Sequence, residues 1–173
     1  MNYYTKLARE SINYFLKNNK LVPIPPTTPK SLISQKAGTF VSLHLKPSNE
    51  LRGCIGTFLP TKSNVAEEII HNAVAAATED PRFLPLTLDE LPKVEISVDI
   101  LSSPKLVSKT TKLDPKKTGL IVSSSDGRRG LLLPDIGGVE TVAEQERICR
   151  LKAGISATEP ISRHYFTVKR FHE

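Results

Sequence analysis

The sequence predicts an α+β fold in which helices pack against a mixed, largely antiparallel sheet. Two patterns favour this class. Hairpin patterns outnumber strict strand–helix–strand alternation, and the predicted helices stand singly among the strands. The chain has 173 residues, of which 39% are hydrophobic and 24% charged. That size and composition fit one globular domain over residues 1–173 with a real core.

The N-terminal third of the chain predicts one helix and one hairpin. Residues 3–18 carry apolar side chains near the helical period, and a proline-rich connection over residues 19–36 follows in extended form. Residues 39–45 alternate apolar and polar, which is typical of a half-buried strand. After a polar turn, residues 51–59 form the returning strand.

The middle of the chain contains the clearest helix pattern. Residues 64–79 carry an uninterrupted apolar stripe, and Asn64 with Glu67 resembles a capping box. The many alanines on the stripe predict close packing against a sheet. Residues 94–100 then alternate cleanly and predict a strand with one buried face.

The last third predicts a second hairpin, a helix and a final strand. An Asp-Gly turn separates the apolar runs 119–122 and 130–133, which is a strong hairpin signal. A helix over residues 140–152 ends at Gly154, a residue suited to the C-cap. Residues 164–171 are rich in aromatic and β-branched side chains and predict the closing strand.

The first hairpin allows a prediction of register. Its alternation places Val41, Leu43 and Leu45 on the core face, together with Leu51 and Ile55. The opposite face then carries four side chains that could do chemistry: Ser42, His44, Arg52 and Cys54.

Cys54 is the candidate nucleophile of this face. A thiolate is the reactive form, Arg52 would favour it electrostatically, and His44 could act as the base. The alternative is that Cys54 is a small buried side chain, placed between glycines where nothing larger fits.

Other candidate site residues lie near Cys54 or in the second hairpin. Gly53 and Gly56 interrupt a strand, which indicates a bend or the close approach of a ligand or another backbone. Asp80 and Arg82 could line a cleft at the helix end, or form an ion pair at a helix stop. Arg128 and Arg129 could meet an anion, although an exposed turn is the simpler interpretation.

Charge and cysteine usage limit the function classes. The net charge of +6 permits an anionic partner such as nucleic acid or a nucleotide, but no motif indicates one. The four histidines and two cysteines lack metal-ligand spacing, so no metal site is predicted. The two cysteines lie far apart in the sequence, which predicts a reduced, cytoplasmic protein. We find no apolar run of about 18 residues and no signal-peptide pattern, so no passage into a membrane is predicted.

Several segments resemble one known family in the expected order. The motif LRGCIGT at residues 51–57 resembles the signature of the AMMECR-one family, also called system protein A of the AmmeMemoRadiSam set. The remaining matches, which extend the resemblance over residues 5–171, are DPRF with PLT at 80–87, DELP at 89–92, the strand 94–101, GLIV at 119–122, GLLLP at 130–134 and LKAG at 151–154.

The resemblance implies a two-lobed α+β domain with a cleft between the lobes. The larger lobe would hold both termini and the smaller lobe would be inserted into it. Family members are often encoded beside, or fused to, a Memo-type protein, and a radical S-adenosylmethionine enzyme commonly accompanies them. The resemblance therefore implies an enzyme or accessory subunit of a shared modification pathway, with no established mechanism and no assigned cofactor. A non-catalytic module that binds a nucleotide, RNA or protein through a basic surface is the alternative.

Overall fold

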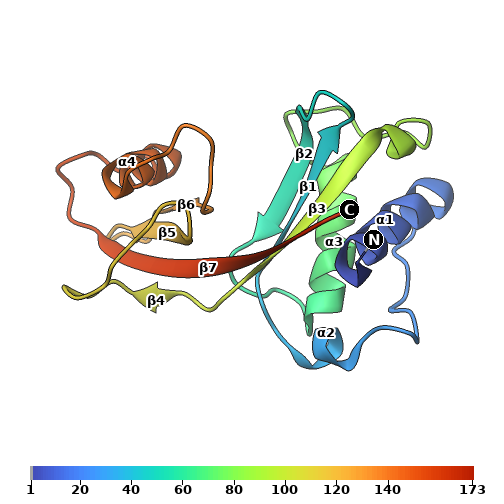
Figure 1. Cartoon of the computed structure of the whole chain (residues 1–173), viewed down its shortest axis with the longest axis horizontal. Coiled ribbons are helices and arrows are strands. Elements are labelled where there is room, and N and C mark those ends of the chain that lie inside the picture. Colours follow the sequence, from blue (N-terminus) through green and yellow to red (C-terminus); the bar gives the residue numbers. More distant parts are fainter. Residues whose placement is uncertain (1) are drawn as a thin grey trace. The chain divides into compact units, whose positions relative to one another are not determined.

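The computed structural model describes residues 2–173 and confirms the α+β class (Figure 1). The described chain divides into two compact units, one made of residues 2–101 with 169–173 and one made of residues 102–168. The strands follow the order β2-β1-β3-β7-β5-β6, with β4 paired to β7, and every described pair for which a register is given is antiparallel.

The first unit contains three helices, a 3-10 turn and three complete strands. In chain order these are α1 (Tyr3–Asn18), α2 (Lys30–Ser34), β1 (Thr39–Leu45), β2 (Leu51–Thr57), α3 (Val65–Thr78), η1 (Leu91–Lys93) and β3 (Val94–Leu101). The short helix α2 lies within the segment that was predicted to be extended, where Pro29 directly precedes its first turn.

Caps define both long helices of this unit. The Asn2 side chain accepts a hydrogen bond from Thr5 N at the start of α1, and the Asn64 side chain accepts one from Glu67 N at the start of α3. α1 ends at Asn19 in the left-handed conformation. The predicted capping box of α3 is thereby confirmed on its Asn64 side.

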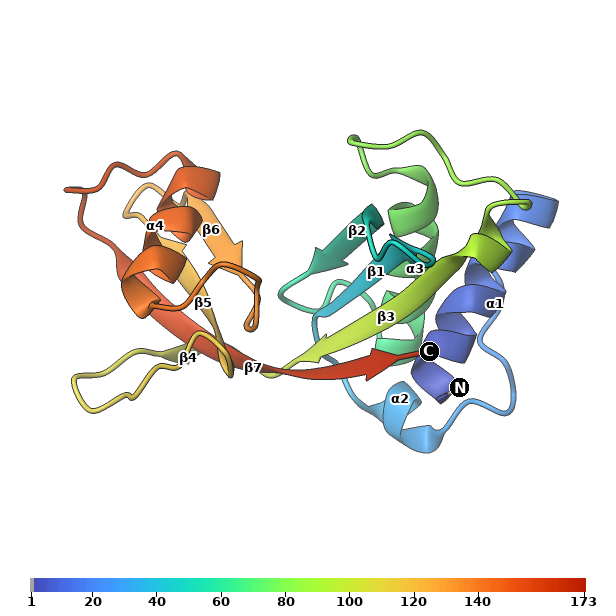
Figure 2. The same ribbon diagram turned by 45° about the horizontal axis from the view of Figure 1, so that its top comes forward.

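α1 and α3 lie beside β1–β3 (Figure 2) and bury one face of these strands. Val41, Leu43, Ile69, Ala73 and Ile96 are all completely buried there. At Gly53 the strand comes so close to α3 that an added Cβ would lie 2.1 Å from Ala76 O. Glycine is therefore required for this contact between two backbones.

The register of the first hairpin is confirmed over most of its length. Val41 lies opposite Ile55 and Ser42 lies opposite Cys54. The prediction that Leu51 faces the core is wrong: a register shift between Leu43 and His44 places Leu51 opposite His44. Since directly opposed residues share a face, Leu51 leaves the core side and is 37% exposed.

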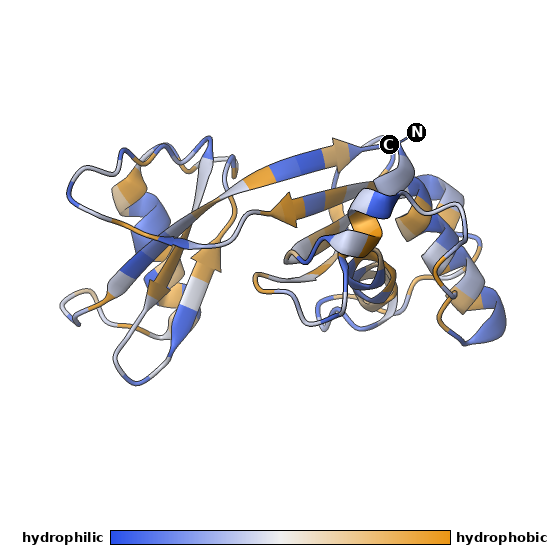
Figure 3. Cartoon of the chain, turned by 90° about the horizontal axis from the view of Figure 1, so that it is seen from below, coloured by the Kyte–Doolittle hydropathy of each residue, from blue (hydrophilic) through white to orange (hydrophobic). Residues whose placement is uncertain are grey.

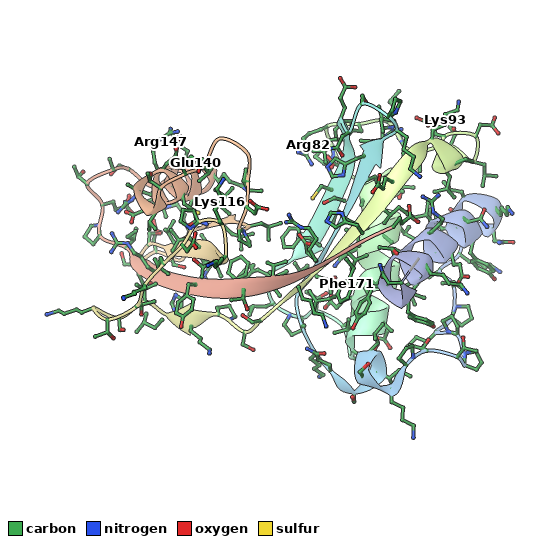
Figure 4. The ribbon with its side chains drawn as sticks, in the orientation of Figure 1. Arg82, Lys93, Lys116, Glu140, Arg147 and Phe171 are labelled. Atoms are coloured by element: carbon green, nitrogen blue, oxygen red, sulfur yellow. The ribbon has the colours of Figure 1, made fainter. Side chains whose placement is uncertain are left out.

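The C-terminal end of β7 (Ser162–His172) is fixed within the first unit. Phe171 (labelled in Figure 4) stacks on Tyr4 of α1, with 3.8 Å between the ring centroids. The Glu173 carboxylate accepts hydrogen bonds from Arg9 and from Ile96 N. Figure 3 shows hydrophobic bands between hydrophilic ones along β7.

The second unit packs one helix on a small sheet. It comprises β4 (Lys105–Leu106), β5 (Thr118–Ser123), β6 (Arg129–Leu132), α4 (Val142–Ala153) and the first part of β7. An added Cβ at Gly130 would lie 1.8 Å from Cys149 O, so β6 touches the backbone of α4. Cys149 is completely buried beside Leu120 and Val122 and belongs to the core of this unit. Across residues 2–173, no helix has the length and hydrophobicity needed to cross a membrane.

Candidate functional site

Cys54 lies on the polar face of β2, directly opposite Ser42 of β1. The Ser42 hydroxyl donates a hydrogen bond of 3.2 Å to Cys54 Sγ. Cys54 N–H points away from β1 toward Asp80, so Ser42 and Cys54 form a non-hydrogen-bonded pair, the type in which opposed side chains approach most closely. The ladder itself therefore sets the thiol–hydroxyl contact.

Asp80 and Arg82 occupy the outer edge of β2 at Cys54. Asp80 Oδ2 accepts from Cys54 N at 2.8 Å, and Arg82 Nη2 donates to Cys54 O at 3.5 Å. Asp80 in turn accepts from Arg82 Nε at 2.9 Å and Nη2 at 2.7 Å. Since β2 is the last strand on its side of the sheet, this pair supplies an acceptor and a donor where a neighbouring strand would otherwise provide them.

The electrostatic surroundings of Cys54 favour a protonated thiol. Burial raises the pKa of Cys54, and the hydrogen bond from Ser42 and the charge of Arg82 offset this rise only in part. The carboxylates of Asp80 and Asp99 raise the Cys54 pKa further. By contrast, the Asp80 pKa is held far below its usual range, chiefly by the hydrogen bond from Arg82. The resting site thus pairs a neutral thiol with an ionised carboxylate.

Arg52 is engaged away from the thiol. Its guanidinium donates to both carboxylate oxygens of Glu90, at distances between 3.1 and 3.3 Å, and lies 5.9 Å from the centroid of the Phe83 ring. Arg82 lies over the same ring at 5.4 Å. Phe83 therefore lies within cation–π distance of two arginines. Arg52 is not among the groups that shift the Cys54 pKa.

His44 lies on the same face as Cys54, but its surroundings are different. In the sheet it lies opposite Glu95 of β3. Burial lowers the His44 pKa, as do the charges of His172 and Arg170, while the Glu95 carboxylate raises it. A neutral imidazole can accept a proton, as a base must. The hydrogen bond that the thiol accepts nevertheless comes from Ser42, two residues before His44 on β1.

Arg128 and Arg129 belong to the second unit. Arg128 pairs with Asp126 and Glu159 and donates to Gly154 O at 2.5 Å, so it holds the loop that follows α4. Arg129 begins β6 opposite Ser123, is exposed, and forms no ion pair with any described residue.

The described residues contain no group of three or more His, Cys, Asp or Glu side chains that could hold a metal ion. Cys54 and Cys149 are both free thiols. No cofactor is assigned to the site by its geometry.

Residues 5–173 match the AMMECR1 family model. The chain belongs to the AMMECR1 family. A protein of Thermotoga maritima is 50% identical over 97% of this chain and 96% of its own length. A Clostridium acetobutylicum protein is 43% identical over 98% of this chain, but the match spans only 36% of that longer protein.

The fold is also similar to that of a crystallised protein. The crystal structure of an uncharacterized protein from Pyrococcus horikoshii has a TM-score of 0.83 and 30% sequence identity. The likeness covers 99% of this chain and 90% of that one. This AMMECR1-family chain therefore shares its α+β architecture with a solved structure.

Three groups around the site of this AMMECR1-family chain were missed at the sequence level. Glu90 binds Arg52, Asp99 binds Arg170 through both carboxylate oxygens at 2.8 and 3.0 Å, and Ser97 lies beside Ser42 on β3. The alternation of residues 94–100 places Ser97 and Asp99 on one face, which was a usable signal. Nothing in the sequence pairs Arg52 with Glu90 or Arg170 with Asp99, because these contacts join residues 38 and 71 positions apart.

Proposed function

We propose that this AMMECR1-family protein is an enzyme or an accessory subunit of a cytoplasmic modification pathway that also uses a Memo-type protein and a radical S-adenosylmethionine enzyme. Its functional surface would be the polar face of β1 and β2 around Cys54. The observation that carries this proposal is the oriented thiol: Ser42 contacts Sγ at 3.2 Å while Asp80 holds the Cys54 peptide from the other side.

Such an arrangement suits a nucleophile that is activated only when substrate is present. A protonated thiol is a poor nucleophile, so reaction requires proton removal, and His44 on the same face is the base of this proposal. Gly53 and Gly56 shape the strand beneath the thiol, and Asp80 with Arg82 fixes its backbone. Arg52 acts on the site through Glu90 and Phe83 rather than on the thiol directly.

A genetic test separates catalysis from a structural role. In a host that lacks its own copy, the wild-type chain and a Cys149→Ser variant should restore the missing modified product, while Cys54→Ser should not. Cys149 is the matched control because it is the other free thiol and lies buried in the second unit. Thermal unfolding must show that both variants fold. Restoration by Cys54→Ser would reject the enzyme proposal.

The second candidate is a non-catalytic module that binds a nucleotide, RNA or protein through a basic surface: the net charge of +6 supports it, and the raised pKa of Cys54 fits a thiol that does no chemistry. In that case the thiol serves as a neutral group in a binding face. Affinity for the partner would then survive Cys54→Ser, and co-purification with the Memo-type protein or the radical enzyme would be the readout.

A further inference from the structure

The positive charge of the protein is concentrated in one segment of the second unit. Residues 102–168 carry a net charge of +4, and residues 105–117 alone, with five lysines and one aspartate, also carry +4. We call residues 105–117 the lysine segment. The rest of the second unit is therefore neutral overall, and its charge comes from this one stretch.

Three of the five lysines have no acidic partner among the described residues. Lys116 pairs with Glu140 at 2.8 Å (Figure 4) and Lys117 pairs with Asp114 at 3.6 Å. Lys105, Lys109 and Lys112 form no ion pair with any residue in the range 2–173, and all three are exposed. These three are available to an external anion.

The lysine segment is anchored at both ends. At its start, Lys105 lies opposite Tyr165 in the β4–β7 pair, and Val107 N donates to Arg163 O at 2.9 Å. At its end, Thr118 N donates to Asp114 O at 2.7 Å. Between these points, Ser108 N donates to Thr111 Oγ1 at 2.9 Å. The three free lysines are therefore presented from an ordered backbone.

The composition of the lysine segment fits a phosphate backbone better than a protein or a membrane. Protein interfaces favour Arg and aromatic residues and are depleted in Lys, and this segment contains no Arg, Tyr, Phe, Trp or Met. An interfacial membrane element needs an apolar face, but the segment is not helical and Leu106 is its only large hydrophobic residue that is strongly exposed, at 66%. Phosphates need charge alone, which lysine supplies.

We propose that the lysine segment binds the phosphate backbone of nucleic acid without reading its sequence. Lys105, Lys109 and Lys112 would each neutralise one phosphate, and no aromatic side chain in the segment is available for base stacking. This site lies in the second unit and does not involve Cys54, so its test is independent of the test of the proposed enzyme function.

The salt dependence of binding gives a quantitative test. Each neutralised phosphate contributes about −0.9 to the slope of log K against log salt on a DNA duplex, so three contacts predict a slope of about −2.7. Affinity should then fall about 40-fold between roughly 50 and 200 mM KCl. Fluorescence anisotropy with a labelled mixed-sequence DNA duplex of about 20 base pairs measures this directly.

Two triple variants with equal charge change locate the site. Replacing Lys105, Lys109 and Lys112 by Gln should remove the slope and most of the binding. Replacing Lys20, Lys30 and Lys36 by Gln in the first unit should leave both unchanged, because these lysines are equally exposed and lie outside the segment. Cys54→Ser should also bind the duplex normally.

Several results would overturn the proposal. Absence of salt-dependent duplex binding by the wild-type chain would reject it, as would an equal loss in both triple variants. Tighter binding to phosphatidylserine vesicles, or to poly-glutamate, than to the duplex would assign the lysine segment to a membrane surface or an acidic polypeptide instead.

Discussion

Replacing Gly53 by alanine tests the claim that β2 and α3 touch through their backbones. A Cβ at this position would lie 2.1 Å from Ala76 O, whereas ordinary van der Waals contact begins near 3.4 Å. The strand or the helix must therefore move by roughly 1 Å. The obstacle is backbone, which has no alternative rotamer, so we expect a cost near the upper end of overpacking effects, about 3 kcal/mol.

This cost converts into a large change in melting temperature. At about 2.1 cal/mol/K per residue, the unfolding entropy of 173 residues is roughly 0.36 kcal/mol/K, so about 3 kcal/mol lowers Tm by about 8 °C. Calorimetry or circular dichroism measures this shift, and a urea titration confirms that the free energy of unfolding has fallen.

Gly137→Ala is the matched control for Gly53→Ala. No atom lies within 4 Å of a Cβ at Gly137, and its φ is not positive. Both variants make the same covalent change, so their effects on the unfolded chain are similar, and Gly137→Ala should match or slightly exceed the wild-type Tm. If Gly53→Ala melts within about 2 °C of Gly137→Ala, the close approach of β2 and α3 does not constrain the fold.

Three further outcomes follow from buried or shifted groups. Glu68→Gln should lower the free energy of unfolding by about 1–3 kcal/mol, because the buried carboxylate accepts hydrogen bonds from Thr61 N and Lys62 N. Glu79 is exposed, so Glu79→Gln should change this free energy little. A urea titration measures both variants. Because folding lowers the Asp80 pKa, Asp80 stabilises the protein above its unfolded pKa of about 3.9, and this stability is lost as the pH falls through its folded pKa. Asp80→Asn should therefore flatten the decline of the free energy of unfolding below about pH 4. An unchanged decline would contradict the ion pair with Arg82. The rate at which iodoacetamide modifies Cys54 should rise with pH around a midpoint above that of free cysteine, and Ser42→Ala should raise this midpoint further. Cys149, whose pKa is raised to about 12, should stay unmodified. A Cys54 midpoint below that of free cysteine would contradict a protonated resting thiol.

Much of the fold was predictable because its signals are local. The apolar stripe of α3, its Asn64 cap, the alternation of β3 and the Asp-Gly turn of the second hairpin are properties of neighbouring residues, and each element formed close to its predicted range. The two short elements α2 and β4 were missed because five and two residues carry too little periodicity to be read.

The candidate site was predictable only as a face of a hairpin. Alternation placed Ser42, His44 and Cys54 together, but it could not detect the bulge that turns Leu51 out of the core. The contacts that decide the chemistry join distant residues: Asp80 reaches Cys54 N across 26 positions, and Glu90 takes Arg52 away from the thiol. Such pairings depend on how separate elements pack.

In the LRGCIG motif, residues 51–56, some features follow from the local sequence and others from tertiary packing. Local pattern alone shows two glycines flanking a cysteine on a strand, which requires some close approach, and it predicts that the arginine and the thiol share one face. That the backbone of α3 is what approaches Gly53 follows from the packing of the helix on the strand, because the contact exists only with the helix in place. Packing also buries the thiol, and this burial, with the nearby carboxylates of Asp80 and Asp99, raises the Cys54 pKa above that of a free cysteine, so the thiolate is disfavoured further.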